Sequence, residues 1–223
     1  MSDPAGALER LQRDAGAACP RLLEARAYTT EQLALRRESL ADLECPQGVS
    51  VVLFGSWARG ELTGESDDDW AVLVESEDIA ADVVEPVESA ARSIFGQGDK
   101  KPGAQDLFGT SFWCDELVRQ IGLEEDSNRI LTRRMLLLLE SIPVIGEDAH
   151  RRCWDRVLHT YLDRASKHYR PPRFLLNDVV RYWRTMCVDF EGKHWDGVPD
   201  EKWVTRNAKL RTSRKVLFAA GLV

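Results

Sequence analysis

The sequence lacks most of the features that mark secreted, zinc-stabilised or membrane proteins. Its five cysteines (Cys19, Cys45, Cys114, Cys153 and Cys187) are odd in number, widely spaced and without a Cys-x-x-Cys pair, which argues against a disulfide framework or a zinc ribbon. The N-terminal stretch has no apolar signal core, and the longest apolar runs fall far short of the roughly 20 residues that span a bilayer. These absences predict reduced thiols, a cytoplasmic location and no membrane partner.

Two familiar phosphate-binding patterns are also missing. The chain has neither the Gly-x-x-x-x-Gly-Lys loop of many nucleoside triphosphatases nor the Gly-x-Gly-x-x-Gly turn of dinucleotide-binding enzymes. Its four histidines (His150, His159, His168 and His194) lack the spacing of metal-ligand pairs. The sequence therefore disfavours these two enzyme classes and gives no sign of a histidine-based metal site.

Charge is distributed unevenly along the chain. The formal net charge is −7, which disfavours a surface for non-specific binding of duplex DNA. Residues 61–78 contain eight carboxylates and no Lys or Arg, whereas residues 202–223 contain six cations and no acid. The first segment is suited to binding cations and the second to binding anions.

The first half of the chain alternates between helix and strand patterns. Two short apolar runs rich in β-branched residues, at residues 49–54 and 70–74, predict buried strands. Between them, Gly55-Ser56 predicts a tight turn followed by a short helical turn. The other elements expected here are a helix over residues 7–44 broken near Pro20, a helix over 78–95, and a third strand within 105–113.

Beyond about residue 114 the sequence shows helical patterns and no further strand signal. The expected helices cover residues 128–141, 148–168, 173–190 and 200–220, with residues 142–146 as a brief extended link. This pattern predicts an α+β fold: a small mixed β-sheet with helices on one face, followed by a helical bundle. We expect an α/β core with its N-terminal helices at residues 1–124 and a helical domain at 125–223, with the active site in the cleft between them.

The chemistry-bearing segment is FGSWARGELTGESDDDWAVLV, residues 54–74. Gly55 allows close approach of the backbone to a phosphate, and Ser56 offers a hydroxyl and backbone N–H groups at a helix start. Eleven residues after Ser56, Asp67 and Asp69 stand at the head of the next strand. Residues i and i+2 of a strand point to one face, so these two carboxylates converge while Asp68 points away.

Two carboxylates on one face with no cation nearby repel each other, unless a divalent cation lies between them. Their hard oxygen donors suit Mg²⁺, or Mn²⁺ in its place. The alternative interpretation is that Asp67-Asp68-Asp69 is a polar turn capped by Ser66. The Gly-Ser pair at this spacing, with strands on both sides, favours the metal site.

This segment resembles the signature of the DNA polymerase beta superfamily of nucleotidyltransferases: Gly-Ser, about ten residues, then Asp-x-Asp followed by apolar residues. The stretch LLLLESIPVIGEDAHRRCWDRVL and, less closely, RNAKLRTSRKVL resemble regions after the core of the uridylyltransferases that modify nitrogen-signalling proteins. No His-Asp dyad is present, so the phosphohydrolase domain of those regulators is absent. The resemblance implies a two-metal mechanism, in which one metal activates the attacking hydroxyl and the other stabilises the pyrophosphate.

The resemblance also implies a third carboxylate on a neighbouring strand, able to act as the base for the incoming hydroxyl. Asp106 is the first candidate and Asp115 the second, although Asp106 sits among glycines where it could instead end a turn. The triphosphate further needs cations on its outer side. We expect Lys209 and Arg206 to serve there, against the alternative of a solvated helix face. Arg59 is a weaker candidate that could simply pair with Glu61 or Glu65.

The motif fixes a reaction type rather than a substrate pair. A nucleoside triphosphate, with ATP as one expected donor, transfers its nucleoside monophosphate to a hydroxyl acceptor and releases pyrophosphate. The acceptor is expected to be a protein, a tRNA or a small molecule such as an antibiotic. The alternative from another class is a catalytically silent nucleotide-sensing or antitoxin-like module, with a partner protein from the same operon. Retention of both aspartates favours the enzyme.

Overall fold

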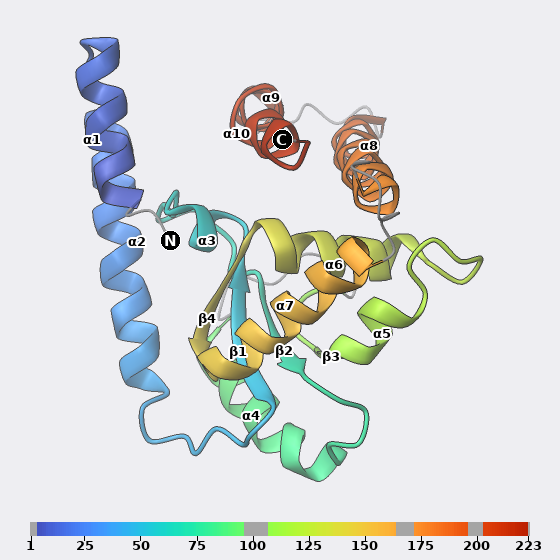
Figure 1. Ribbon diagram of the computed structural model, residues 1–223. Coiled ribbons are helices and arrows are strands. Elements are labelled where there is room, and N and C mark those ends of the chain that lie inside the picture. The colour runs from blue at the N-terminus through green and yellow to red at the C-terminus, as the bar shows by residue number, and fades with distance from the viewer. Residues whose placement is uncertain (1–3, 96–106, 164–171, 196–202, 223) are drawn as a thin grey trace.

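The computed structural model describes residues 4–95, 107–163, 172–195 and 203–222 (Figure 1). Its centre is a mixed four-stranded sheet in the order β3-β2-β1-β4. The strands are β1 (Val49–Phe54), β2 (Trp70–Val74), β3 (Ser111–Trp113) and β4 (Ser141–Ile145). Strand β1 is antiparallel to β2 and β4, whereas β2 is parallel to β3. The predicted mixed sheet with helices is confirmed.

Helices cover both faces of this sheet, so the expectation of helices on one face was wrong. Val52 and Leu73 point into a core formed with α5 (Cys114–Arg119), α6 (Asn128–Leu139), α7 (Glu147–Asp163) and α8 (Arg173–Trp195). Val51 and Val72 point the other way, into a core formed with α2 (Pro20–Ser39) and α4 (Ala81–Ile94). Every residue of β1 and β2 is therefore buried, and the run of apolar residues in each strand serves both cores.

The sequence suggested a brief extended link at residues 142–146. In the structure, Ser141–Ile145 form the edge strand β4. It pairs with β1 from Phe54↔Ser141 to Val51↔Ile145, with an irregularity between Val51 and Val52. Pro143 suits an edge, because proline has no N–H to give to a neighbouring strand, and its carbonyl accepts from Arg37 Nη2 at 3.2 Å. The sheet thus draws on residues from both sides of the expected boundary at 124/125.

The N-terminal helices form a long arm beside the sheet (Figure 1). Helix α1 (Pro4–Ala15) ends before Pro20, which starts α2, as the sequence predicted. The single helix expected at residues 200–220 is two helices, α9 (Trp203–Arg211) and α10 (Ser213–Ala220), separated at Thr212. Phe218 of α10 stacks on Trp183 of α8, with ring centroids 5.3 Å apart. None of the helices in the described ranges is both long and apolar enough to cross a bilayer.

Candidate active site

The turn after β1 places Gly55 and Ser56 at one end of the sheet. Gly55 has φ 63° and ψ −120°, a conformation that favours glycine because a Cβ would be strained there. Its N–H donates to the carbonyl of Glu140 at 3.1 Å, just before β4. The one-turn helix α3 (Ser56–Arg59) follows directly, and its Arg59 N–H returns to the Gly55 carbonyl at 3.0 Å. The turn is thereby held between β1 and β4.

The aspartate triplet reaches the same end of the sheet from the neighbouring strand. The carbonyl of Asp69 accepts a hydrogen bond from Phe54 N–H at 2.9 Å, which aligns it with the last residue of β1. A Cβ placed on Gly55 would lie 3.7 Å from Asp69 Oδ2, so no side chain separates the carboxylate from the turn. Asp67 is exposed, whereas Asp68 is buried with Arg36 Nη2 3.9 Å from its carboxylate. Asp68 thus points toward α2, as the alternation of a strand requires.

The electrostatics of Asp69 are dominated by burial and by other acids. Burial raises the pKa of Asp69 to about 6, with further increases from the charges of Asp67, Glu140 and Asp68 and an opposing decrease from Arg214. In such surroundings the ionised form of the carboxyl is disfavoured, because it is buried and is repelled by neighbouring carboxylates. At Asp69 the charges of the neighbouring carboxylates thus outweigh the opposing charge of Arg214.

Glu140 is a site residue that the sequence analysis missed. It is 4 % exposed and accepts from Tyr182 Oη at 2.8 Å and from Arg59 Nη1. Arg59 Nε also donates to Glu61 Oε2 at 2.9 Å, so the expected pairing of Arg59 with Glu61 is present. Although burial lowers the pKa of Arg59, the two glutamates raise it overall. This buried network connects the turn after β1 with α8, and its one sequence signal is a lone acid ending the apolar run of residues 135–139.

A family comparison is consistent with this geometry. Residues 35–135 match the model of the family described as the nucleotidyltransferase domain. The chain contains a nucleotidyltransferase domain. No curated protein and no solved structure matches the chain. The nucleotidyltransferase domain includes the Gly55-Ser56 turn and both aspartates, while Glu140 and Tyr182 follow it in sequence.

A cation from the C-terminal helices acts on the site of the nucleotidyltransferase domain. Arg214 of α10 lowers the pKa of Asp69 and also opposes the rise in the pKa of Tyr182, and it was not among the predicted residues. Of the two cations that were, Lys209 is exposed and Arg206 half-buried on α9. Lys209 and Arg206 as phosphate contacts stay predictions. The sequence indicated Arg214 only as one of the six cations of the basic segment at residues 202–223.

Of the two candidates for a third carboxylate, one is described and lies elsewhere. Asp115 accepts from the N–H of Glu77 at 2.8 Å and from Arg156. Although burial raises the pKa of Asp115, these hydrogen bonds lower it overall. Because Glu77 follows the far end of β2, Asp115 is at the opposite end of the sheet from Asp69 and does not complete the site. Asp106 lies outside the described residues, and its role stays a prediction.

The described carboxylates of the nucleotidyltransferase domain fit a hard divalent cation in part. No group of three His, Cys, Asp or Glu side chains within the described ranges is arranged to enclose a metal ion. Asp67 and Asp69 supply two oxygen donors in a field of excess negative charge, the donor type that Mg²⁺ prefers. Mg²⁺ commonly binds through one or two carboxylates, with water and substrate phosphate as its other ligands. A pair of aspartates is therefore a chemically sufficient protein contribution.

We expect Asp69→Asn to stabilise the protein in the absence of divalent cations. The folded-state pKa of about 6 lies above the ordinary 3.8, so ionised Asp69 destabilises the fold above pH 6. This cost is on the order of 1–3 kcal/mol and disappears as the pH falls toward 4. Urea unfolding in EDTA at several pH values between 4 and 8 measures it. An equal gain at pH 4 and pH 8 would show that electrostatic relief is not its cause.

Proposed function

We propose that this protein is a divalent-cation-dependent nucleotidyltransferase that moves a nucleoside monophosphate from a nucleoside triphosphate to a hydroxyl acceptor. The observation that carries the proposal is the meeting of Asp69 with the Gly55 turn, 3.7 Å from the place of a Cβ, inside a nucleotidyltransferase domain. An open backbone turn beside paired acids suits a phosphate chain accompanied by a cation. ATP is one donor that this arrangement would accept.

Each described residue has a distinct role in the proposed reaction. Asp67 and Asp69 hold the divalent cation, and the turn at Gly55 and Ser56 lets the triphosphate approach the backbone. Arg214, whose charge already acts on Asp69, neutralises phosphate charge. When bound, Mg²⁺ or Mn²⁺ supplies charge neutralisation at the phosphates and promotes ionisation of the attacking hydroxyl.

The bond changes of the proposed reaction are those of in-line displacement. A bond forms between the acceptor oxygen and the α-phosphorus, while the bond from that phosphorus to the bridging oxygen breaks and pyrophosphate leaves. The acceptor's hydroxyl proton must pass to a base, for which Asp106 is the proposed residue. Glu140 is held by Arg59 and Tyr182, so its carboxylate is engaged in positioning the turn rather than in accepting this proton.

The acceptor is proposed as a protein, a tRNA or a small hydroxyl compound. The net charge of −7 weighs against broad nucleic-acid binding, whereas the six cations of residues 202–223 keep a tRNA backbone among the candidates. A partner protein from the same operon belongs to the alternative proposal, the nucleotide-sensing or antitoxin-like module. We further propose that the reaction takes place in the cytoplasm.

The proposal is tested by incubating the protein with each α-³²P-labelled nucleoside triphosphate, Mg²⁺ or Mn²⁺, and cell lysate. The lysate is then separated into protein, RNA and small-molecule fractions. Label that enters one fraction, and is lost in an Asp67→Asn variant, identifies the nucleotide and the acceptor class together. Nucleotide binding without transfer to any fraction contradicts the enzyme and supports the nucleotide-sensing or antitoxin-like module.

We expect Arg214→Ala to raise the KM for the nucleoside triphosphate by roughly tenfold, because a charge-assisted phosphate contact is worth about 1.5–3 kcal/mol. The matched comparison is Lys215→Ala, the exposed neighbour on the same helix, for which we expect little change. Lys209→Ala and Arg206→Ala measured in the same series test the two cations predicted from sequence. An unchanged KM in Arg214→Ala would remove Arg214 from the triphosphate site.

A further inference from the structure

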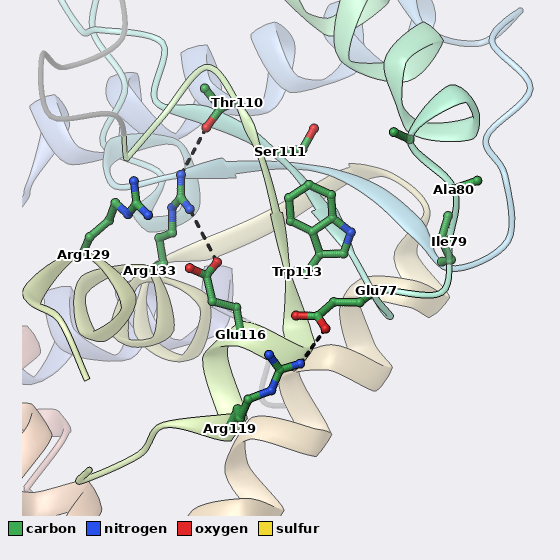
Figure 2. A pocket seen from close by; sticks show the side chains of 11 residues that line it. Glu77, Ile79, Ala80, Thr110, Ser111, Trp113, Glu116, Arg119, Arg129 and Arg133 are labelled. Atoms are coloured by element: carbon green, nitrogen blue, oxygen red, sulfur yellow. Dashed lines mark hydrogen bonds and ion pairs between the residues drawn. The ribbon is translucent and has the colours of Figure 1, made fainter. Parts of the chain in front are cut away.

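A cavity lies along the edge strand β3, apart from the aspartate pair (Figure 2). Its volume is about 840 Å³, within the range of sites for small organic ligands. The start of α4, strand β3 and helices α5 and α6 contribute its walls, and neither Asp67 nor Asp69 lines it. The cavity is therefore a site that the proposed transfer reaction leaves without a role.

Two arginines of α6 give this cavity a basic side. Arg129 and Arg133 are one helical turn apart and both line the cavity, and Figure 2 shows the Arg133 side chain pointing toward Thr110. Arg133 Nη2 donates to the Thr110 hydroxyl at 3.1 Å, and its Nη1 lies 3.9 Å from Glu116. Arg129 is exposed and has no hydrogen bond or ion pair in the described part of the chain. Like charges at this spacing repel, so an anion between them would stabilise the pair.

The remaining charges of the cavity do not neutralise this side. Arg119 Nη2 lies 2.6 Å from Glu77 Oε2. In Figure 2 this pair lies on the other side of the Trp113 ring from Thr110. The lining then holds three arginines against two carboxylates, of which Glu116 lies 3.9 Å from Arg133. A net positive charge beside two guanidinium groups is the environment that phosphate oxygens favour, since each guanidinium can donate two parallel hydrogen bonds.

An indole provides the second recognition element. Trp113, the last residue of β3, is half-buried and lies between the Arg133–Glu116 pair and Ile79 (Figure 2). The guanidinium of Arg133 is itself fixed over the Phe112 ring, 5.1 Å from its centroid. A planar base can stack on the accessible part of an indole without any particular pattern of hydrogen bonds. The cavity thus offers an aromatic surface and a phosphate-binding group side by side.

We propose that this cavity binds a nucleotide, with its phosphate at Arg129 and Arg133 and its base against Trp113. The site is independent of divalent cations, because its charge is positive and its recognition groups are guanidinium and indole. It is also independent of the proposed transfer reaction, which uses Asp67 and Asp69, just before the start of β2. A nucleotide here is a bound ligand and undergoes no bond change.

Titration calorimetry with the four nucleoside monophosphates in EDTA tests the proposal, using the Asp67→Asn/Asp69→Asn protein so that the metal-dependent site contributes nothing. At least one nucleotide is expected to bind. Arg129→Ala, which alters an exposed side chain, should weaken that binding about tenfold. Trp113→Leu should weaken it by a similar factor, with a thermal melt confirming that the variant is folded.

Two comparisons make the outcome decisive. Arg151→Ala, an exposed arginine of α7 outside the cavity, should bind as the parent does. Inorganic phosphate and adenosine alone should each bind more weakly than the nucleotide that contains both groups. Absence of binding by all four nucleotides overturns the proposal. Equal binding by Arg129→Ala, or by phosphate alone, overturns it as well, because either result removes one of the two recognition elements.

Discussion

Asp67→Asn and Asp69→Asn are each expected to reduce nucleotidyl transfer by roughly 10³-fold or more, the scale seen when a charge-stabilising group is removed from a transition state. Asparagine keeps the size of the side chain but removes the charge that holds the cation. The fold should persist, because Asp67 is exposed and Asp69 is repelled by its neighbours. Pyrophosphate release at saturating triphosphate, with circular dichroism as a folding check, measures the effect.

Asp68→Asn is the matched control from the same triplet. Its carboxylate is buried toward Arg36 and away from the Gly55 turn, so transfer should stay within about tenfold of the parent protein. Some loss of thermal stability is expected from weakening a buried ion pair. If the Asp68 variant were as inactive as the variants of Asp67 and Asp69, the conclusion that the Asp68 side chain points away from the site would be contradicted.

The parts of the fold that the sequence predicted are those encoded over short distances. Residues 49–54 and 70–74 are short apolar runs rich in valine, and both are strands. Gly55-Ser56 had to be a turn because it joins such a run to a polar segment. The two helices on either side of Pro20 followed in the same way from a local breaker. These features depend on backbone preferences that a few neighbouring residues determine.

Features that depend on contacts between distant segments were harder to predict. Residues 141–145 form a strand only because β1 has a free edge, and Pro143 weakens any local strand signal. The helices on both faces could have been expected, since β1 and β2 read as continuous apolar runs rather than as alternating ones. That signal indicates burial of both faces of each strand.

In the candidate site, too, some features are encoded locally and others depend on contacts between distant segments. The aspartate pair and the Gly55 turn lie within 15 residues and share one sequence motif. Glu140, Tyr182 and Arg214 join them only through the folding of α6, α8 and α10. A single acid, phenol or guanidinium on a helix has many possible partners, so nothing in its local sequence indicates which of them it meets.

Arg134→Met is expected to destabilise the protein by about 3–5 kcal/mol, the cost of leaving buried charges without their partner. Arg134 is fully buried, and its Nη2 lies 2.9 Å from Asp126 and 2.7 Å from Asp178, each with a side chain only 1 % exposed. It also donates to Tyr161 Oη at 2.5 Å and to the carbonyl of Leu117 at 3.0 Å. Helices α6, α7 and α8 therefore share this one guanidinium.

Chemical unfolding at pH 7 measures the loss, with Arg129→Ala on the exposed side of the same helix as control, expected within about 0.5 kcal/mol of the parent. Although burial raises the pKa of Asp126, hydrogen bonds from Arg134 and Arg181 lower it overall. The stabilisation by Arg134 should thus be complete above the ordinary carboxyl pKa and decline as the pH falls through the lowered one. Adding Asp178→Asn to Arg134→Met should recover part of the loss, because it removes one buried charge left without its partner. If Arg134→Met were neutral, Arg181, which contacts both aspartates, would be sufficient to compensate them, and Arg134 would contribute only its packing.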